Sequence, residues 1–263
     1  MKKRISLLGL LVLAASAVLA FSPYENNLLT QSVKRVGLIA SVKPGQLANM
    51  NKALQNLAEK RMVKALAKKD ISNLSCYQKV LDDTSWVMVY FDYAGDNYLA
   101  AASAFESVAM RIEALKMAII PHPRAKRYGT SWLQMEWISY IRGSLSSEKS
   151  KNAYAMVTTI KPEMEKEYRM LHQSVWPGVV DQMARGNNRN FSIFLVEIGA
   201  KIYEFFYVEY VGNDLKKDGE RNRTDPANLR WWKLTDVCQN PLPGTKDIWT
   251  MMDKVESKKE VKK

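Results

Sequence analysis

The stretch Asn190-Phe-Ser-Ile-Phe194 has a counterpart 117 residues earlier in the chain, Asn73-Leu-Ser-Cys-Tyr77. The same spacing relates Val208-Glu-Tyr210 to Phe91-Asp-Tyr93 without a gap. Separated matches in one order and at one spacing are typical of an internal duplication. The chain is therefore predicted to contain two copies of one structural unit.

Each copy is predicted to fold as a ferredoxin-like β-α-β-β-α-β unit. Short apolar runs bounded by turn residues indicate strands, and apolar residues recurring every three to four positions indicate helices. In the first copy we expect strands over residues 33–42, 74–81, 86–93 and 132–138, and helices over 47–69 and 99–118. In the second copy we expect strands over 153–160, 190–196, 201–211 and 248–255, and helices over 164–184 and 226–235.

The resulting fold class is α+β, with two tandem domains over residues 33–140 and 153–256. A polar linker over residues 141–152 separates them. An open sheet with helices on one face leaves its other face bare. Packing the two bare faces together would bury both, so we expect a pseudo-dimeric α/β barrel within one chain. Further homo-oligomerisation stays open.

Residues 1–20 are typical of a signal peptide. A basic segment, Lys2-Lys3-Arg4, precedes an apolar run from Ile5 to Leu19 with small-residue cleavage sites. This pattern predicts an exported protein, periplasmic if the source is bacterial, while an uncleaved anchor is the alternative. No later segment is long and apolar enough to cross a membrane. Residues 257–263 form a basic tail.

The composition limits the kinds of ligand and partner that the protein is expected to bind. The formal net charge is +12 at pH 7, but the basic residues are scattered and no nucleic-acid-binding motif occurs, so no nucleic-acid partner is expected. The chain has two histidines and two cysteines without ligand spacing, which predicts no metal site and no cofactor. Cys76 lies in an apolar strand and is expected to be a buried free thiol, although pairing with Cys238 stays open.

The second copy carries a set of reactive and flat side chains on one predicted helix. Tyr168, His172 and Trp176 are spaced four residues apart, which places them on one helix face. The first-copy counterparts of Tyr168 and His172 are Met50 and Leu54. The first copy therefore keeps the apolar periodicity and loses the polar groups.

A second set of flat side chains follows in the same copy. Trp231 and Trp232 lie beside Arg230 and Lys233 on the last predicted helix. Their first-copy counterparts, Arg111 and Ile112, are not aromatic. A single site, in the second half of the chain, is the prediction.

Each candidate also has a structural interpretation. A histidine on an apolar helix face is more often part of a core than of a site, and a tryptophan pair more often packs than binds. Asn190 either hydrogen-bonds a ligand hydroxyl or ends a turn. Trp176, before Pro177, is expected to shape the helix end and the wall of a pocket.

Taken together, Tyr168-x3-His172-x3-Trp176-Pro177, Asn190 with its strand, and Arg230-Trp-Trp-Lys233 make the second copy similar to the L-rhamnose mutarotases. The resemblance implies a dimeric α/β barrel that interconverts the α and β anomers of L-rhamnose without metal or organic cofactor. It implies a monosaccharide pocket lined by Tyr168, His172, Trp231 and Trp232, with His172 as the proton-transfer residue. We therefore take His172 and Tyr168 as candidate catalytic residues, and Trp231, Trp232, Trp176 and Asn190 as candidate substrate-binding residues.

Two other functions stay open. Degeneration of the first copy is compatible with a catalytically inactive sugar-binding or structural module. A third reading is another α/β-barrel activity, such as a cofactor-independent oxygenase or a haem-handling protein. The export signal, the tandem arrangement and the polar segment over residues 216–223 all depart from the typical family member.

Overall fold

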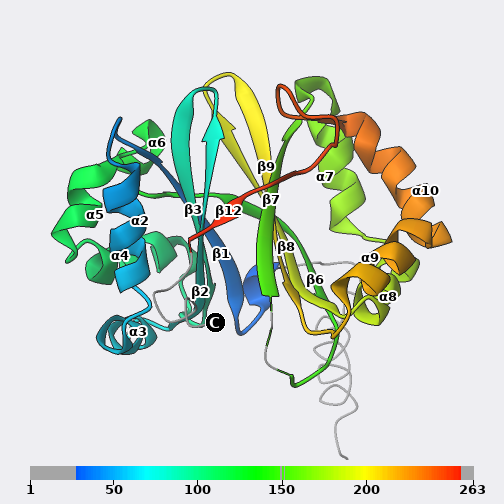
Figure 1. The fold of residues 1–263 in the computed structure, drawn as a ribbon, viewed down its shortest axis with the longest axis horizontal. Coiled ribbons are helices and arrows are strands. Elements are labelled where there is room, and N and C mark those ends of the chain that lie inside the picture. Colours follow the sequence, from blue (N-terminus) through cyan, green and yellow to red (C-terminus); the bar gives the residue numbers. More distant parts are fainter. Residues whose placement is uncertain (1–27, 149, 151, 256–263) are drawn as a thin grey trace, which may run out of the picture.

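The computed structural model describes residues 28–148, 150 and 152–255. Two antiparallel sheets lie side by side in the middle of the molecule, and helices cover the outer face of each (Figure 1). The predicted signal peptide over residues 1–20 and the basic tail over 257–263 lie outside the described residues. Within the part described, no helix has the length and apolar character of a membrane span.

The first sheet has six strands. Its order is β12 (Asp253–Lys254), β2 (Ile71–Leu81), β3 (Thr84–Tyr93), β1 (Lys34–Val42) and β4 (Ile119–Ile120), with β5 (Leu133–Gln134) also beside β1. The second sheet repeats this plan. Its order is β10 (Gln239–Asn240), β7 (Asn152–Ile160), β9 (Lys201–Tyr210), β8 (Asn188–Ile198) and β6 (Glu136–Gly143), with β11 (Thr250–Met251) also beside β7. The predicted α+β class is confirmed, and the duplication is visible in the strand order.

The predicted closing strands over residues 132–138 and 248–255 do not stay within their own copies. The first divides into β5, which pairs with β1, and β6, which pairs with β8 of the other sheet. The second divides into β11 on β7 and β12 on β2. Figure 1 shows β12, in red, crossing from the second half to the first. Each half thus covers a sheet edge of the other, and this protects hydrogen-bonding groups that an open edge would expose.

The crossing points have matching geometry. The Met135 amide donates to the Gly37 carbonyl at 2.8 Å, and the Met252 amide donates to the Ala155 carbonyl at 3.0 Å. Both methionines are buried in a core shared by the two sheets. A Cβ on Gly37 would lie 2.6 Å from Met135 Cε and 3.0 Å from the Phe194 ring, so a larger residue there would force the Met135 side chain to move.

The inner faces of the two sheets meet through aromatic side chains. Tyr90 on β3 and Tyr207 on β9 hold equivalent positions in the repeat, and their rings stack with centroids 3.4 Å apart at 11°. Phe194 on β8 packs edge-on against Tyr90. The bare faces expected from the sequence are therefore buried against each other.

Most of the long helices predicted from periodicity are interrupted. On the first half lie α2 (Leu47–Asn56), α3 (Lys60–Ala67), α4 (Ala101–Ala109), α5 (Glu113–Ala118) and α6 (Pro123–Lys126). On the second lie α7 (Glu165–Gln173), α8 (Pro177–Arg185), α9 (Leu215–Thr224) and α10 (Pro226–Thr235). Short 3-10 turns occupy Leu28–Thr30, Tyr98–Ala100, Pro162–Met164 and Asp236–Cys238.

Local sequence features account for one of these interruptions and for one helix that the periodicity did not predict. Pro177 stands at the first turn of α8, where its missing amide is tolerated, and it ends the continuity with α7. The charged segment over residues 213–224, which periodicity leaves unassigned, forms α9 because the Asp214 side chain caps it by accepting from the Lys217 amide at 3.0 Å.

Both cysteines are buried and free. Cys76 lies on β2 in the helix-side core of the first half, as predicted. Cys238 lies in the helix layer of the second half. The two thiols belong to different cores, so they do not pair.

Candidate active site

A cavity of about 600 Å³ lies in the second half, between the outer face of its sheet and α7, α8, α9 and α10. The sheet contributes mainly apolar and aromatic side chains, Tyr154, Met156, Phe191, Ile193, Phe206 and Val208. In the first half, buried apolar residues fill the corresponding space, among them Met50, Leu54 and Phe105. The volume suits a small organic ligand.

Helix α7 presents Tyr168 and His172 to this cavity, and both are buried. Their ring centroids lie 4.2 Å apart. His172 Nδ1 lies 3.0 Å from the Tyr168 backbone carbonyl, which only accepts, so Nδ1 carries the hydrogen and Nε2 keeps its lone pair. Burial lowers the pKa of His172 to about 4, which keeps the imidazole neutral near pH 7.

Helix α10 presents both Trp231 and Trp232 to the cavity. Trp231 is buried and meets the His172 ring edge-to-face at 5.4 Å. The Trp176 ring also packs edge-to-face against Trp231, with centroids 5.4 Å apart, but Trp176 does not line the cavity. Trp176, a candidate binding residue in the sequence, therefore packs against Trp231 instead of lining the ligand space.

Asn190 does not line this cavity and lies at the junction of the two halves. It sits at a bulge of β8 in the left-handed conformation, with φ of 53°, as does its counterpart Asn73. Its side-chain oxygen accepts from Arg35 at 3.3 Å and from the Tyr140 hydroxyl at 3.1 Å. Asn190 joins the two halves, so of its two sequence interpretations the turn is the one observed.

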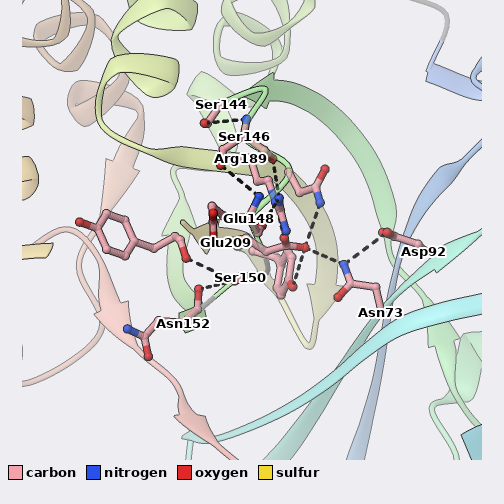
Figure 2. Close-up of polar contacts among 12 residues, drawn as sticks. Asn73, Asp92, Ser144, Ser146, Glu148, Ser150, Asn152, Arg189 and Glu209 are labelled. Carbon is pink, nitrogen blue, oxygen red and sulfur yellow. Dashed lines mark hydrogen bonds and ion pairs between the residues drawn. The ribbon is translucent and has the colours of Figure 1, made fainter. Parts of the chain in front are cut away.

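The same junction is held by Glu209 on β9 (Figure 2). Its carboxylate accepts from Asn73 at 2.6 Å, from Asn190 at 2.9 Å and from Arg189 at 2.8 Å. Burial alone would raise the pKa of Glu209, but the hydrogen bonds from Asn190, Arg189 and Asn73 outweigh it and lower the pKa. Figure 2 shows Asn73 linking Glu209 to Asp92 of the first half.

Sequence reasoning missed two residues beside the cavity, Glu204 and Gln239. Glu204 lies on β9 and is fully buried on the helix side of the sheet. Its carboxyl group hydrogen-bonds the Tyr168 hydroxyl, and Gln239 Nε2 donates to Glu204 Oε2 at 2.8 Å. Burial raises the pKa of Glu204 to about 8.

The signal for Glu204 is visible in its strand, Lys201-Ile-Tyr-Glu-Phe-Phe-Tyr-Val-Glu-Tyr210. Side chains alternate between the two faces of a strand. Tyr203, Phe205 and Tyr207 point into the shared core, so Glu204 belongs to the helix side, together with Phe206. A carboxyl group in such an apolar run rarely occurs without a partner.

Register identifies the first-half counterparts of these residues. Glu204 pairs with Thr158 as Val87 pairs with Ala40, and Gln239 pairs with Ile160 as Ile119 pairs with Val42. Tyr168, His172, Glu204 and Gln239 thus replace four buried apolar residues, Met50, Leu54, Val87 and Ile119. Across the described residues, no group of three or more His, Cys, Asp or Glu side chains could hold a metal ion.

Comparison with known proteins gives two sequence matches. Residues 153–256 match the model of the family described as L-rhamnose mutarotase. The L-rhamnose mutarotase of Oceanobacillus iheyensis is 27% identical over 78 residues, which cover 30% of this chain and 70% of that protein.

Solved structures give more distant matches. A provisionally named monooxygenase from Lactobacillus acidophilus NCFM has 8% identity and a TM-score of 0.48, covering 84% of this chain and 94% of that one. A similarly named protein from Fusobacterium nucleatum subsp. nucleatum has 13% identity and a TM-score of 0.47, covering 85% and 92%. Chlorite dismutase from Candidatus Nitrospira defluvii has 12% identity and a TM-score of 0.41, covering 86% and 93%.

The family model ends one residue beyond the described second repeat and begins at the second residue of β7. It therefore covers the half that holds the cavity, with Tyr168, His172 and the three cavity tryptophans, Trp231, Trp232 and Trp249. The resemblance drawn from the sequence is confirmed, and it is the second half of this chain, residues 153–256, that is similar to the L-rhamnose mutarotase family.

Proposed function

We propose that the chain is an aldose mutarotase that interconverts the α and β anomers of L-rhamnose or a related deoxyhexose, without a cofactor. The observation that carries the proposal is the meeting of Tyr168, His172 and Trp231 at one cavity. They meet in the half that is similar to the mutarotases, and the other half has apolar residues in place of Tyr168 and His172.

The cavity chemistry suits the reaction. Opening a pyranose ring requires a proton on the ring oxygen and removal of the proton from the anomeric hydroxyl. His172 Nε2, which is neutral and carries a lone pair, accepts the proton of the anomeric hydroxyl. The Tyr168 hydroxyl donates a proton to the ring oxygen. Rotation about one carbon–carbon bond and closure on the other face complete the exchange. A positioned acid–base group contributes about 10²–10⁴-fold to such a step.

The cavity walls suit a deoxy sugar. Trp231, Trp232 and Trp249 supply flat apolar surface for C–H groups and a methyl group. Gln182, Asn222 and Asp236 supply polar atoms for hydroxyl groups. A ligand of this class needs such a mixture of apolar walls and a few polar groups.

The test is anomer exchange followed by saturation-transfer NMR on L-rhamnose, L-fucose and related sugars. Acceleration of at least one sugar is expected, and no acceleration of any would refute the proposal. His172→Ala should lower the rate by about 10²–10⁴-fold. His122→Ala is the matched control, since His122 caps α6 in the first half and should leave the rate unchanged. Sugar binding by calorimetry without exchange would instead indicate a binding module.

We propose in addition that the two sheets form a pseudo-dimeric α/β barrel within one chain and that the protein is exported. The exchanged strands β6 and β12 support the first point, because each sheet is completed by the other half. Residues 1–20 support the second. Size-exclusion chromatography with light scattering and cell fractionation test the two points separately.

A further inference from the structure

The carboxyl group of Glu204 is hydrogen-bonded to the Tyr168 hydroxyl and does not itself line the cavity. Tyr168 lines the cavity, and Glu204, fully buried, does not. The Tyr168 hydroxyl and Glu204 Oε1 form a hydrogen bond, and Gln239 Nε2 donates to Oε2 at 2.8 Å. Gln239 also lines the cavity, so Glu204 lies buried between two residues that face the ligand space and is hydrogen-bonded to both.

The direction of the Tyr168–Glu204 hydrogen bond decides what Tyr168 can do. A phenol has one proton to donate. If Glu204 is ionised, Tyr168 donates that proton to Oε1 and has none for a ligand. If Glu204 is protonated, the carboxyl group donates to the phenol oxygen, and Tyr168 is free to donate into the cavity.

Gln239 determines which oxygen of Glu204 holds the proton. Because its Nε2 donates to Oε2, that oxygen acts as an acceptor, and a proton on the carboxyl group lies on Oε1, next to Tyr168. The amide therefore directs the proton toward the phenol.

Few charges surround Glu204. From the helix side, Tyr168 and the buried thiol of Cys238 face it, and from the neighbouring strands come Thr158 and Leu195, which do not titrate. Asp236, at the end of α10, acts on Tyr168. Among the described residues, no cation contributes to the shift of the Glu204 pKa. Burial raises this pKa to about 8 against the lowering effect of the hydrogen bonds with Tyr168 and Gln239, so the protonated form of Glu204 is the major one at pH 7.

The geometry points to Glu204 as a positioning residue that passes a proton through Tyr168 to the ring oxygen of the sugar. This inference rests on the proposed mutarotase function. Met50, Val87 and Ile119 stand at the places of Tyr168, Glu204 and Gln239 in the first half, so the whole set of polar groups belongs to the half with the cavity.

The step balances in protons and electrons. Tyr168 Oη gives its proton to the ring oxygen and receives the Glu204 proton, while His172 Nε2 takes the anomeric proton. The bond between C1 and the ring oxygen breaks, its electron pair goes to that oxygen, and the O1–H pair forms the aldehyde C=O. Closure reverses every transfer, so nothing is oxidised or reduced.

The first experiment measures anomer exchange between pH 6 and pH 10 for the wild type, Glu204→Gln and Glu204→Asp. We expect the wild-type rate to fall as pH rises through about 8. Glu204→Gln should lower kcat by about 10-fold or more, change KM less than about 2-fold and remove the inflection. Glu204→Asp should restore part of kcat together with an inflection.

Glu209→Gln is the matched control. Glu209 lies on the same strand, is buried and bonds a tyrosine, Tyr207 at 3.2 Å, but it faces the junction of the two halves. Its variant should keep the wild-type pH profile. A wild-type inflection that persists in Glu204→Gln overturns the inference even though the mutarotase function stands. If the wild type accelerates no sugar, the mutarotase function is refuted, and the proposed proton transfer from Glu204 through Tyr168 is refuted with it.

A second measurement needs no sugar and covers the case in which a variant fails to fold. Infrared spectroscopy of the wild type, with ¹³C-labelled glutamate side chains, should show a protonated buried carboxyl group at pH 6 that disappears as pH rises through about 8. The band should be absent from Glu204→Gln. Complete ionisation of the glutamates at pH 6 overturns the inference.

Discussion

Replacing Glu204 by glutamine should make the protein more stable at alkaline pH. The carboxyl group has an ordinary pKa of 4.5 and is held at about 8 in the folded chain by burial. The folded state therefore binds more protons than the unfolded state between these values. Stability of the wild type falls as pH rises from about 4.5 to 8, because ionising Glu204 opposes folding.

The size of the effect follows from that pKa. One pKa unit corresponds to about 1.4 kcal/mol, so full ionisation of Glu204 lowers the free energy of unfolding by an amount on the order of 5 kcal/mol. The amide in Glu204→Gln can donate to the Tyr168 oxygen and accept from Gln239, so both partners stay satisfied. At pH 5 we expect the variant to lie within about 1 kcal/mol of the wild type.

The assay is urea unfolding followed by circular dichroism at pH 5, 7 and 9. The stability advantage of Glu204→Gln should grow with pH. Glu209→Gln should show no such growth. Hydrogen bonds from Asn190, Arg189 and Asn73 lower the pKa of Glu209 despite its burial, so ionised Glu209 contributes its stability in full above its unfolded pKa, and the variant should be less stable than the wild type by a similar amount at all three pH values. A difference between wild type and Glu204→Gln that is the same at pH 5 and pH 9 would refute the reasoning.

Three further predictions concern the site and the junction of the halves. Trp231→Ala removes the ring that contacts both His172 and Trp176; it should lower the free energy of unfolding by about 3–5 kcal/mol and raise KM, measured by urea unfolding and anomer exchange. Leu54→His, which restores the histidine position in the first copy, should give no second site and lower stability by about 1–3 kcal/mol because the imidazole enters an apolar core; double the wild-type rate per chain would contradict this. Asn73→Ala removes a donor to buried Glu209. It should lower the free energy of unfolding by about 1.5–3 kcal/mol at pH 7, with a smaller loss at a pH low enough to protonate Glu209. An equal loss at the two pH values would exclude a charge-assisted hydrogen bond.

Much of the fold was predictable because its signals are local. Strand β9 is a nearly continuous apolar run, Pro177 marks a helix start, and the repeat spacing assigns equivalent strands to both halves. The strand exchange was not predictable, because residues 132–138 and 248–255 read as ordinary closing strands in either arrangement. Only contacts between segments distant in sequence determine which sheet receives β6 and β12.

Part of the candidate site was likewise predictable from the sequence, and part of it was not. The sequence by itself determined that Tyr168 and His172 share a helix face, that Trp231 and Trp232 follow on a later helix, and that the first copy lacks all four. Residue identity and helical spacing are sufficient for this, since neighbours on one helix are set by its period.

Only the tertiary structure decided that Asn190 holds the two halves together while Glu204 and Gln239 stand beside the cavity. These residues lie on strands or strand ends whose partners are remote in sequence. Their surroundings depend on which face of the sheet meets the helices and on register between strands, a shift of which by one residue would reverse the faces. Burial then sets the pKa of Glu204, and burial is a property of the packed molecule.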